Sequence, residues 1–143
     1  MTQKYARPPA QQLQELAVFA DCSGRVMKRL SNLGTRVNIR AGQRLTTAGE
    51  RGAEVLFVLA GTAVCFVGDI EEAEFGPGDF FGEVATLDGG PRTATVVART
   101  DMDILVLNGL EFDLLIRSSP DVARRLLLAM AHRLRQANAK AVA

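Results

Sequence analysis

Short segments with strand preference, separated by glycine-containing turns, dominate the middle of this chain. Residues 35–40 alternate polar and apolar side chains, as a half-buried strand does, and residues 55–60 are continuously apolar, which fits a strand buried on both faces. Many short strands of this kind are typical of a β-sandwich or a small barrel, and we interpret them as a jelly-roll barrel. The predicted strands are residues 35–40, 43–47, 55–60, 62–67, 70–75, 92–99 and 103–107.

Helical periodicity flanks this β-rich region on both sides. A helix is predicted after Ser23, a good N-cap residue, and it stops at Gly34. On the C-terminal side, Asn108 can cap a short helix at 110–116, and Pro120 falls in the first turn of the last helix. An earlier helix is predicted from the apolar spacing of Leu13, Leu16, Ala17 and Ala20.

These elements predict one α+β domain, mainly β, at residues 13–140. Residues 1–12 contain Pro8 and Pro9 and little to bury, so we expect a flexible lead-in. A chain of 143 residues is long enough to bury a core of its own.

The last helix has a wider apolar face than one contact with a barrel requires. Val122, Leu126, Met130 and Leu134 recur at a spacing of four, and Leu127 and Leu128 broaden the stripe. We expect a second copy of this protein or a separate effector protein to cover the remainder.

Charge and composition exclude several classes of partner. The net charge of +1 gives no general attraction to nucleic acid or to an anionic membrane, and no apolar run approaches the ~20 residues that span a bilayer. The N-terminus lacks the apolar core of a signal peptide. Cys22 and Cys65 lack the spacing of a metal or redox motif, so we expect two buried thiols in a cytoplasmic protein.

Residues 80–98 carry the chemistry of the chain. Gly82 permits close approach to a ligand, and the free amides of a helix that starts there favour an anion. Arg92 adds a charged fork that suits phosphate oxygens, and Thr93 adds a hydroxyl. Glu83 would repel a phosphate, so it makes sense only if the ligand also carries hydroxyls. A phosphate together with a sugar hydroxyl indicates a nucleotide.

The same stretch resembles the phosphate-binding cassette of the cyclic nucleotide-binding domain family. The family pattern runs Phe-Gly-Glu and later Pro-Arg-Ser/Thr-Ala-Thr, which this chain carries at 81–83 and 91–95, although Thr86 stands where an apolar residue is more usual. The similarity extends over roughly residues 13–138, through further segments at 40–43, 49–52, 57–61 and 75–79.

The resemblance implies a fold and a function. The fold would be an eight-stranded β jelly-roll barrel with N-terminal helices, a short cassette helix and two C-terminal helices. The function would be non-catalytic binding of a cyclic nucleotide in signalling, with cAMP favoured over cGMP. Bacterial transcription factors that resemble this domain continue into a helix-turn-helix, and no residues for one follow here, so DNA is not an expected partner. A membrane is not an expected partner either, because of the net charge and the lack of a long apolar run.

The resemblance also assigns ligand contacts. The cyclic phosphate would meet Arg92, the Thr93 hydroxyl and the amides of Gly82, Val84, Ala85 and Ala94, and Glu83 would accept from the ribose 2′-hydroxyl. Arg133 on the last helix would close over the purine by cation–π stacking; an ordinary solvent-facing arginine is the alternative. The strand side chains Val64, Phe66 and Val96 are expected to contact the purine.

Two less specific interpretations remain open at this point. Arg92 and Glu83 could form an ordinary ion pair, and the whole domain could be a structural or interaction module that binds no nucleotide. Enzyme activity is disfavoured, because no cluster supplies a metal or a general base, and His132 is expected on a helix surface. No cofactor other than the ligand is expected.

Overall fold

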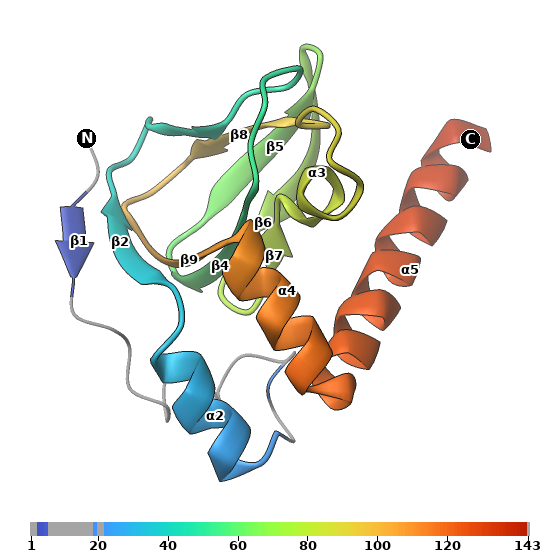
Figure 1. The fold of residues 1–143 in the computed structure, drawn as a ribbon. Helices are drawn as coiled ribbons and strands as arrows, with labels where there is room; N and C mark the ends of the chain where they lie inside the picture. Colours follow the sequence, from blue (N-terminus) through green and yellow to red (C-terminus); the bar gives the residue numbers. More distant parts are fainter. Residues whose placement is uncertain (1–2, 6–18, 20–21, 143) are drawn as a thin grey trace.

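The computed structural model describes residues 3–5, 19 and 22–142 (Figure 1). Two antiparallel sheets pack face to face around an apolar interior. The larger sheet has the order β1-β2-β9-β4-β7, with strands Gln3–Tyr5, Thr35–Ile39, Met102–Asn108, Glu54–Ala60 and Phe80–Phe81. The smaller sheet has the order β3-β8-β5-β6, with strands Arg44–Thr46, Thr95–Ala98, Ala63–Val67 and Ile70–Phe75.

The predicted fold class is confirmed, because the seven predicted strands all form, within two or three residues of the expected ends. Two further strands lie within the described residues. One is β7, which opens the cassette, and the other is β1, which adds to the outer edge of β2. β1 falls within the predicted lead-in, where local sequence carries no strand signal and the open edge of β2 provides the pairing partner.

Strand β4 separates two apolar cores. Its alternate residues Val55, Phe57 and Leu59 face the helices, whereas Leu56 and Val58 face the smaller sheet. Both sets are buried, which explains why the strand is apolar without interruption. Strand β4 therefore packs against the helices on one face and against the smaller sheet on the other.

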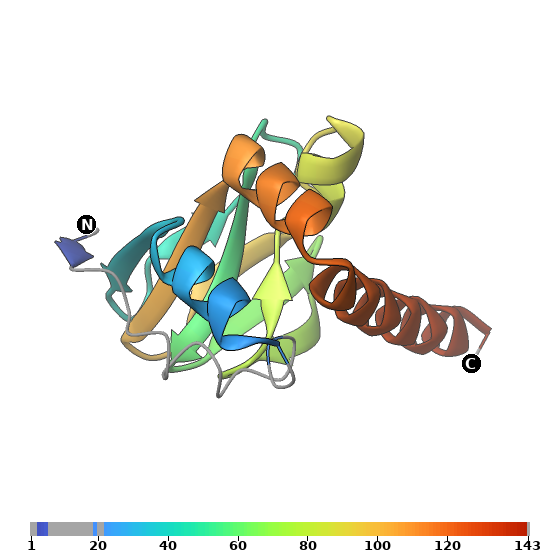
Figure 2. The same cartoon turned by 60° about the horizontal axis from the view of Figure 1, so that its bottom comes forward.

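Three helices cover the outer face of the larger sheet. They are α2 (Gly24–Ser31), α4 (Gly109–Ser118) and α5 (Pro120–Val142), and Figure 2 shows α2 and α4 in front of the strands while α5 extends beyond the barrel. Both predicted caps are present: Ser23 Oγ accepts from the amide of Val26 at 3.3 Å, and Asn108 forms a capping box with Glu111. The fourth helix, α3 (Glu83–Asp88), belongs to the cassette.

The apolar stripe of α5 differs from the prediction. Val122 and Leu126 are buried as expected, but Leu134 is 62% exposed and Arg133 turns inward instead. A spacing of four drifts around a helix of 3.6 residues per turn, so Leu134 lies about 120° from Val122, whereas Arg133 lies within about 20° of it. The prediction that Leu134 faces the barrel is therefore wrong.

Two further predictions concern an N-terminal helix and membrane-spanning segments. The helix expected around Leu13 to Ala20 lies outside the described residues, apart from the buried Phe19, whose ring centroid is 5.5 Å from that of Phe57. None of the helices within the described part of the chain is long and apolar enough to cross a membrane.

Candidate functional site

Gly82 is the point where the chain turns from β7 into α3. Its φ is +89°, and a Cβ there would lie only 2.6 Å from Nη1 of Arg92 and from the carbonyl oxygen of Glu54. Both the backbone conformation and the space therefore require glycine. The helix ends at Asp88, and the amide of its C-cap residue Gly89 donates to the carbonyl of Ala85.

Arg92 is buried beneath this turn and only part of its guanidinium is used. Nη1 donates to the carbonyl of Glu54 at 2.9 Å and to that of Gly82 at 3.1 Å, and the residue is only 8% exposed. Nε and Nη2 donate to no atom of the described residues. Since a guanidinium has five N–H donors, three remain available on one edge of a buried cation.

The surroundings hold Arg92 in this position. Its amide donates to the carbonyl of Glu50 at 2.8 Å, and a Cβ on Gly52 would lie 2.3 Å from Nε. Burial lowers the pKa of the Arg92 guanidinium, while the carboxylates of Glu54 and Glu83 act in the opposite direction. Arginine nevertheless stays charged at neutral pH, so the turn carries a fixed positive charge.

Glu83, at the first position of α3, is also buried, and its partner is not Arg92. Its side chain is 8% exposed, and Oε1 accepts from Nη1 of Arg133 at 3.1 Å. The ion pair between Arg92 and Glu83 that the sequence left open does not form within the described residues. Oε2 of Glu83 accepts no hydrogen bond from them and can still take a donor.

Arg133 brings α5 to the cassette. Besides Glu83, it donates through Nη2 to the carbonyl of Phe80, and its guanidinium lies 4.4 Å from the ring centroid of Phe80 and 5.2 Å from that of Phe75. The alternative of a solvent-facing arginine is therefore wrong. About two turns further along α5, Lys140 donates to the carbonyl of Glu72 on β6, which fixes α5 at a second point.

The remaining predicted contacts lie on the same loop and helix. Thr93 is exposed, and its hydroxyl has no partner among the described residues, while Ala94 accepts from Thr46 Oγ1 at 3.0 Å through its carbonyl. Val84 and Ala85 lie in the first turn of α3, where amides lack intrahelical acceptors. The structure thus places seven of the eight predicted residues between 82 and 94 and brings the eighth, Arg133, into contact with them.

Thr86, which departs from the family pattern, is accommodated within the helix. Its Oγ1 donates to the carbonyl of Gly82 at 2.9 Å, in the usual back-bond of a helical threonine. The hydroxyl is therefore satisfied and leaves the groups that face outward from the cassette unchanged.

The strand side chains predicted to contact the purine do not share a face. Val96 pairs with Cys65 and lies with it in the interior between the sheets, whereas Val64 and Phe66 alternate to the opposite side of β5. The interior cluster that holds Cys65 and Val96 also holds Phe81, the residue before Gly82, so this face is the one toward the cassette. The three side chains therefore do not line one surface, and their contact with the purine stays a prediction.

Sequence analysis missed Cys65, Phe75 and Phe80 as neighbours of the site. Strict alternation from Val96 through its register partner would have identified Cys65, but register between strands is not visible in the sequence. Burial raises the pKa of the Cys65 thiol, with nearby Arg133 acting against it, so the thiol is neutral at neutral pH and packs in the interior as a small apolar group.

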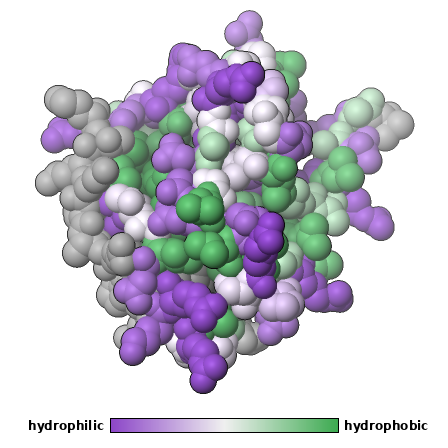
Figure 3. All heavy atoms as spheres, in the orientation of Figure 1, coloured by the Kyte–Doolittle hydropathy of each residue, from purple (hydrophilic) through white to green (hydrophobic). Residues whose placement is uncertain are grey.

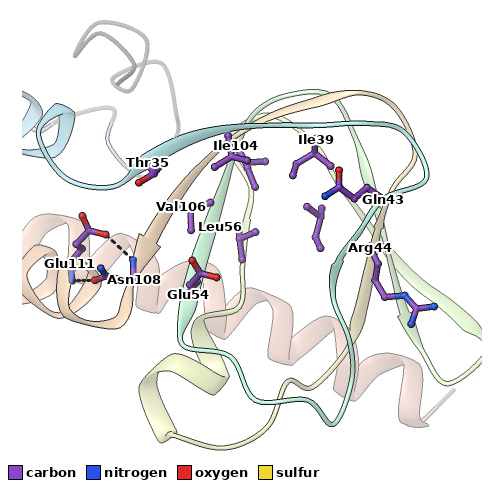
Figure 4. Close-up of a pocket in the computed structure, with 12 residues that line it drawn as sticks. Thr35, Ile39, Gln43, Arg44, Glu54, Leu56, Ile104, Val106, Asn108 and Glu111 are labelled. Atoms are coloured by element: carbon purple, nitrogen blue, oxygen red, sulfur yellow. Dashed lines mark hydrogen bonds between the residues drawn. The ribbon is translucent and has the colours of Figure 1, made fainter. Parts of the chain in front are cut away.

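A separate cavity lies between β2, β3, β4 and β9, and none of the eight predicted residues lines it. Figure 4 shows Leu56, Ile104 and Val106 between Glu54 at one end and Arg44 at the other. At the cassette, the side chain of Arg133 lies on Glu83 and Phe80. In the part of the chain that is described, no three His, Cys, Asp or Glu side chains gather as a metal site.

The sequence profile of the family described as "Cyclic nucleotide-binding domain" matches residues 36–119, which is more than half of the chain. The chain belongs to this family. The matched stretch contains the whole of the cassette, from Gly82 to Ala94, but not Arg133.

Individual relatives agree with the family. A cyclic nucleotide-gated potassium channel of Mesorhizobium japonicum is 40% identical over 85 residues, covering 59% of this chain and 23% of the channel. A cyclic AMP receptor protein of Thermus thermophilus is 36% identical over 102 residues, covering 68% of this chain and 47% of the receptor. The solved structure of the Thermus thermophilus catabolite activator protein matches with a TM-score of 0.76 and 30% identity, over 86% of this chain and 60% of that one.

The chain spans less than half the length of the curated relatives that it matches. The likeness therefore concerns the cyclic nucleotide-binding domain that these proteins share, and it carries nothing about the other parts of the relatives.

Proposed function

We propose that this domain binds a cyclic nucleotide without transforming it and acts as a sensor or regulatory module in the cytoplasm. The observation that carries the proposal is that Nε and Nη2 of the buried Arg92 guanidinium have no acceptor among the described residues. A buried cation that keeps three N–H donors unpaired is costly unless an anion completes it, and a phosphate presents two oxygens to such a fork.

The ligand would lie between the cassette and α5. The cyclic phosphate would accept from Nε and Nη2 of Arg92, from the Thr93 hydroxyl and from amides of Gly82, Val84, Ala85 and Ala94. The ribose 2′-hydroxyl would donate to Glu83, whose carboxylate is buried and keeps one oxygen unpaired.

Arg133 connects the proposed ligand site to α5. In the structure its guanidinium donates to the Glu83 carboxylate and stacks on the ring of Phe80. A ribose hydroxyl that binds Glu83 must therefore share the carboxylate with Arg133 or displace it. We propose that Arg133 then moves onto the purine and α5 closes as a lid. Because α5 already touches β6 and β7, the ligand would exchange contacts of a docked helix and not bring in a distant one.

The surface that would transmit this movement is the outer side of α5. Leu127, Leu128 and Leu134 are 65%, 57% and 62% exposed, and a second copy of the chain or a separate effector would cover them. A shift of α5 would change how these side chains are presented.

Isothermal titration with cAMP, cGMP and the non-cyclic 5′-AMP tests the proposal. We expect saturable binding of cAMP, weaker binding of cGMP because the chain has no set of side chains dedicated to guanine, and the weakest binding of 5′-AMP. Absence of saturable binding by either cyclic nucleotide would contradict the proposal and would favour an interaction module that retains the fold alone.

A further inference from the structure

The cavity at the mouth of the barrel is a hollow of about 310 Å³ that the proposed nucleotide site does not use. Its floor consists of side chains from β2, β3, β4 and β9 that belong to the interior between the sheets or pack against it: Val37, Ile39, Leu45, Leu56, Ile104 and Val106. The size lies at the lower end of the range for small-molecule pockets, about 300–1,000 Å³.

The cavity exists because the two sheets are not joined at this end. Strand β3 is only three residues long, and among the described strands it pairs with β8 alone. Apolar residues on the inner face of β4 and β9 are therefore left without a cover from the smaller sheet. Val106, for example, is only half-buried although it packs against the interior.

Charge is distributed unevenly around the rim. Glu54 and Glu111 lie at one end, as Figure 4 shows, and the carboxylate of Glu54 forms no hydrogen bond or ion pair with the described residues. Glu111 accepts from the amides of Gly34 and Asn108, so it is held in place. At the other end, the guanidinium of Arg44 points away from the floor.

The charge of Arg92 acts on the Glu54 carboxylate but forms no direct contact with it. Arg92 lies against the backbone of Glu54, where Nη1 donates to the carbonyl oxygen, and it makes no hydrogen bond or ion pair with the Glu54 carboxylate. The Glu54 carboxylate at the rim therefore has no hydrogen-bond or ion-pair partner among the described residues and can take a new one.

From this arrangement we propose that the cavity is a second binding site, for a small primary amine with an apolar group. The alkyl or aryl part would lie on Leu56 and Val106, removed from water, and the ammonium would pair with the carboxylate of Glu54. A carboxylate of the same size would be repelled by Glu54 and Glu111, and a neutral alcohol would lack the ion pair.

Three probes with one tail separate the contributions. Hexylammonium, 1-hexanol and hexanoate are titrated into the ¹⁵N-labelled protein, and the amide shifts of Val37, Leu56 and Val106 are followed. We expect saturable shifts with hexylammonium, about fivefold weaker binding of 1-hexanol, as for loss of a partly exposed ion pair, and the weakest binding of hexanoate.

Two variants and a control complete the test. Glu54→Gln keeps the carbonyl that holds Arg92 and should reduce hexylammonium binding to the level of 1-hexanol, while Asp69→Asn, on the β5–β6 turn, should change nothing. Val106→Phe should fill the cavity and abolish binding of all three probes; if it does not fold, Glu54→Gln decides. Absence of saturable shifts at these amides, equal affinity for the three probes, or unchanged hexylammonium binding in Glu54→Gln overturns the proposal. No nucleotide is needed, so the result is independent of the function proposed above.

Discussion

Arg133 on α5 donates to Oε1 of Glu83 on α3 at 3.1 Å, although the two residues are 50 positions apart in the chain. The contact joins the C-terminal helix to the residue proposed to bind the ribose. Any group that donates a hydrogen bond to the Glu83 carboxylate therefore also acts on α5. The ion pair makes the helix and the candidate site parts of one structural unit.

Removing the Arg133 side chain should loosen α5 in the absence of ligand. Arg133→Ala loses the pair with Glu83 and the stacking on Phe80, worth about 1 kcal/mol of local opening free energy, or about fivefold in the exchange rate. Hydrogen exchange over residues 129–139 measures it. Leu134→Ala, which truncates the exposed neighbour, is the control and should leave the exchange rates nearly unchanged. Equal exchange in both variants would mean that Arg133 does not anchor the helix.

Glu83→Gln should weaken binding of cAMP more than binding of its 2′-deoxy analogue. The substitution keeps the shape of the side chain but replaces a charged acceptor for the ribose hydroxyl with a neutral one, which costs about 1 kcal/mol. Titration of both ligands against wild type and variant gives the comparison. Equal losses would show that Glu83 supports the loop and does not contact the sugar.

Gly82→Ala should destabilise the fold more than an alanine at another glycine of positive φ. A Cβ at Gly82 would meet Arg92 and Glu54 at 2.6 Å, whereas one at Gly42, with φ of +88°, meets nothing within 4 Å. Gly42→Ala therefore reports the conformational cost alone, about 1–2 kcal/mol. Urea denaturation of both variants separates that cost from the collision. If the two lose the same stability, the contact between Gly82 and Arg92 is looser than the structure indicates.

The raised pKa of Cys65 predicts a change of stability at alkaline pH. Burial favours the neutral thiol in the folded state, so the unfolded chain ionises first, near the ordinary value of 9.0, and the folded state loses stability as the pH rises from there through the higher folded pKa. The stability advantage of wild type over Cys65→Ala should therefore shrink between pH 8 and 10, as measured by urea denaturation. An advantage that stays constant over this range would contradict the assignment.

Local sequence predicted most of this architecture because the relevant signals are local. Asn108 and Ser23 are good caps, and β4 is apolar throughout because both of its faces are covered. The cassette residues from Gly82 to Ala94 were identified for the same reason, since their order along the chain is itself the motif.

The errors concern relationships between distant segments. Which of Arg133 and Leu134 faces the barrel depends on the helical rotation accumulated along α5. An arginine can turn inward here because it pairs with Glu83 and stacks on the ring of Phe80. The face of β5 that meets Val96 depends on strand register. Strand β1 depends on a free edge of β2 that only the assembled sheet creates.

The most direct test of the proposed function is the affinity of Arg92→Ala for cAMP, measured by isothermal titration beside wild type. We predict a loss of about 2–3 kcal/mol from a charge-assisted contact, with partial recovery in Arg92→Lys, because a point charge lacks the fork. Arg117→Ala, which removes an exposed arginine paired with Asp113, should bind as wild type. Circular dichroism establishes that each variant is folded. If folded Arg92→Ala binds cAMP as tightly as wild type, the cassette does not hold the phosphate and the proposed function is wrong.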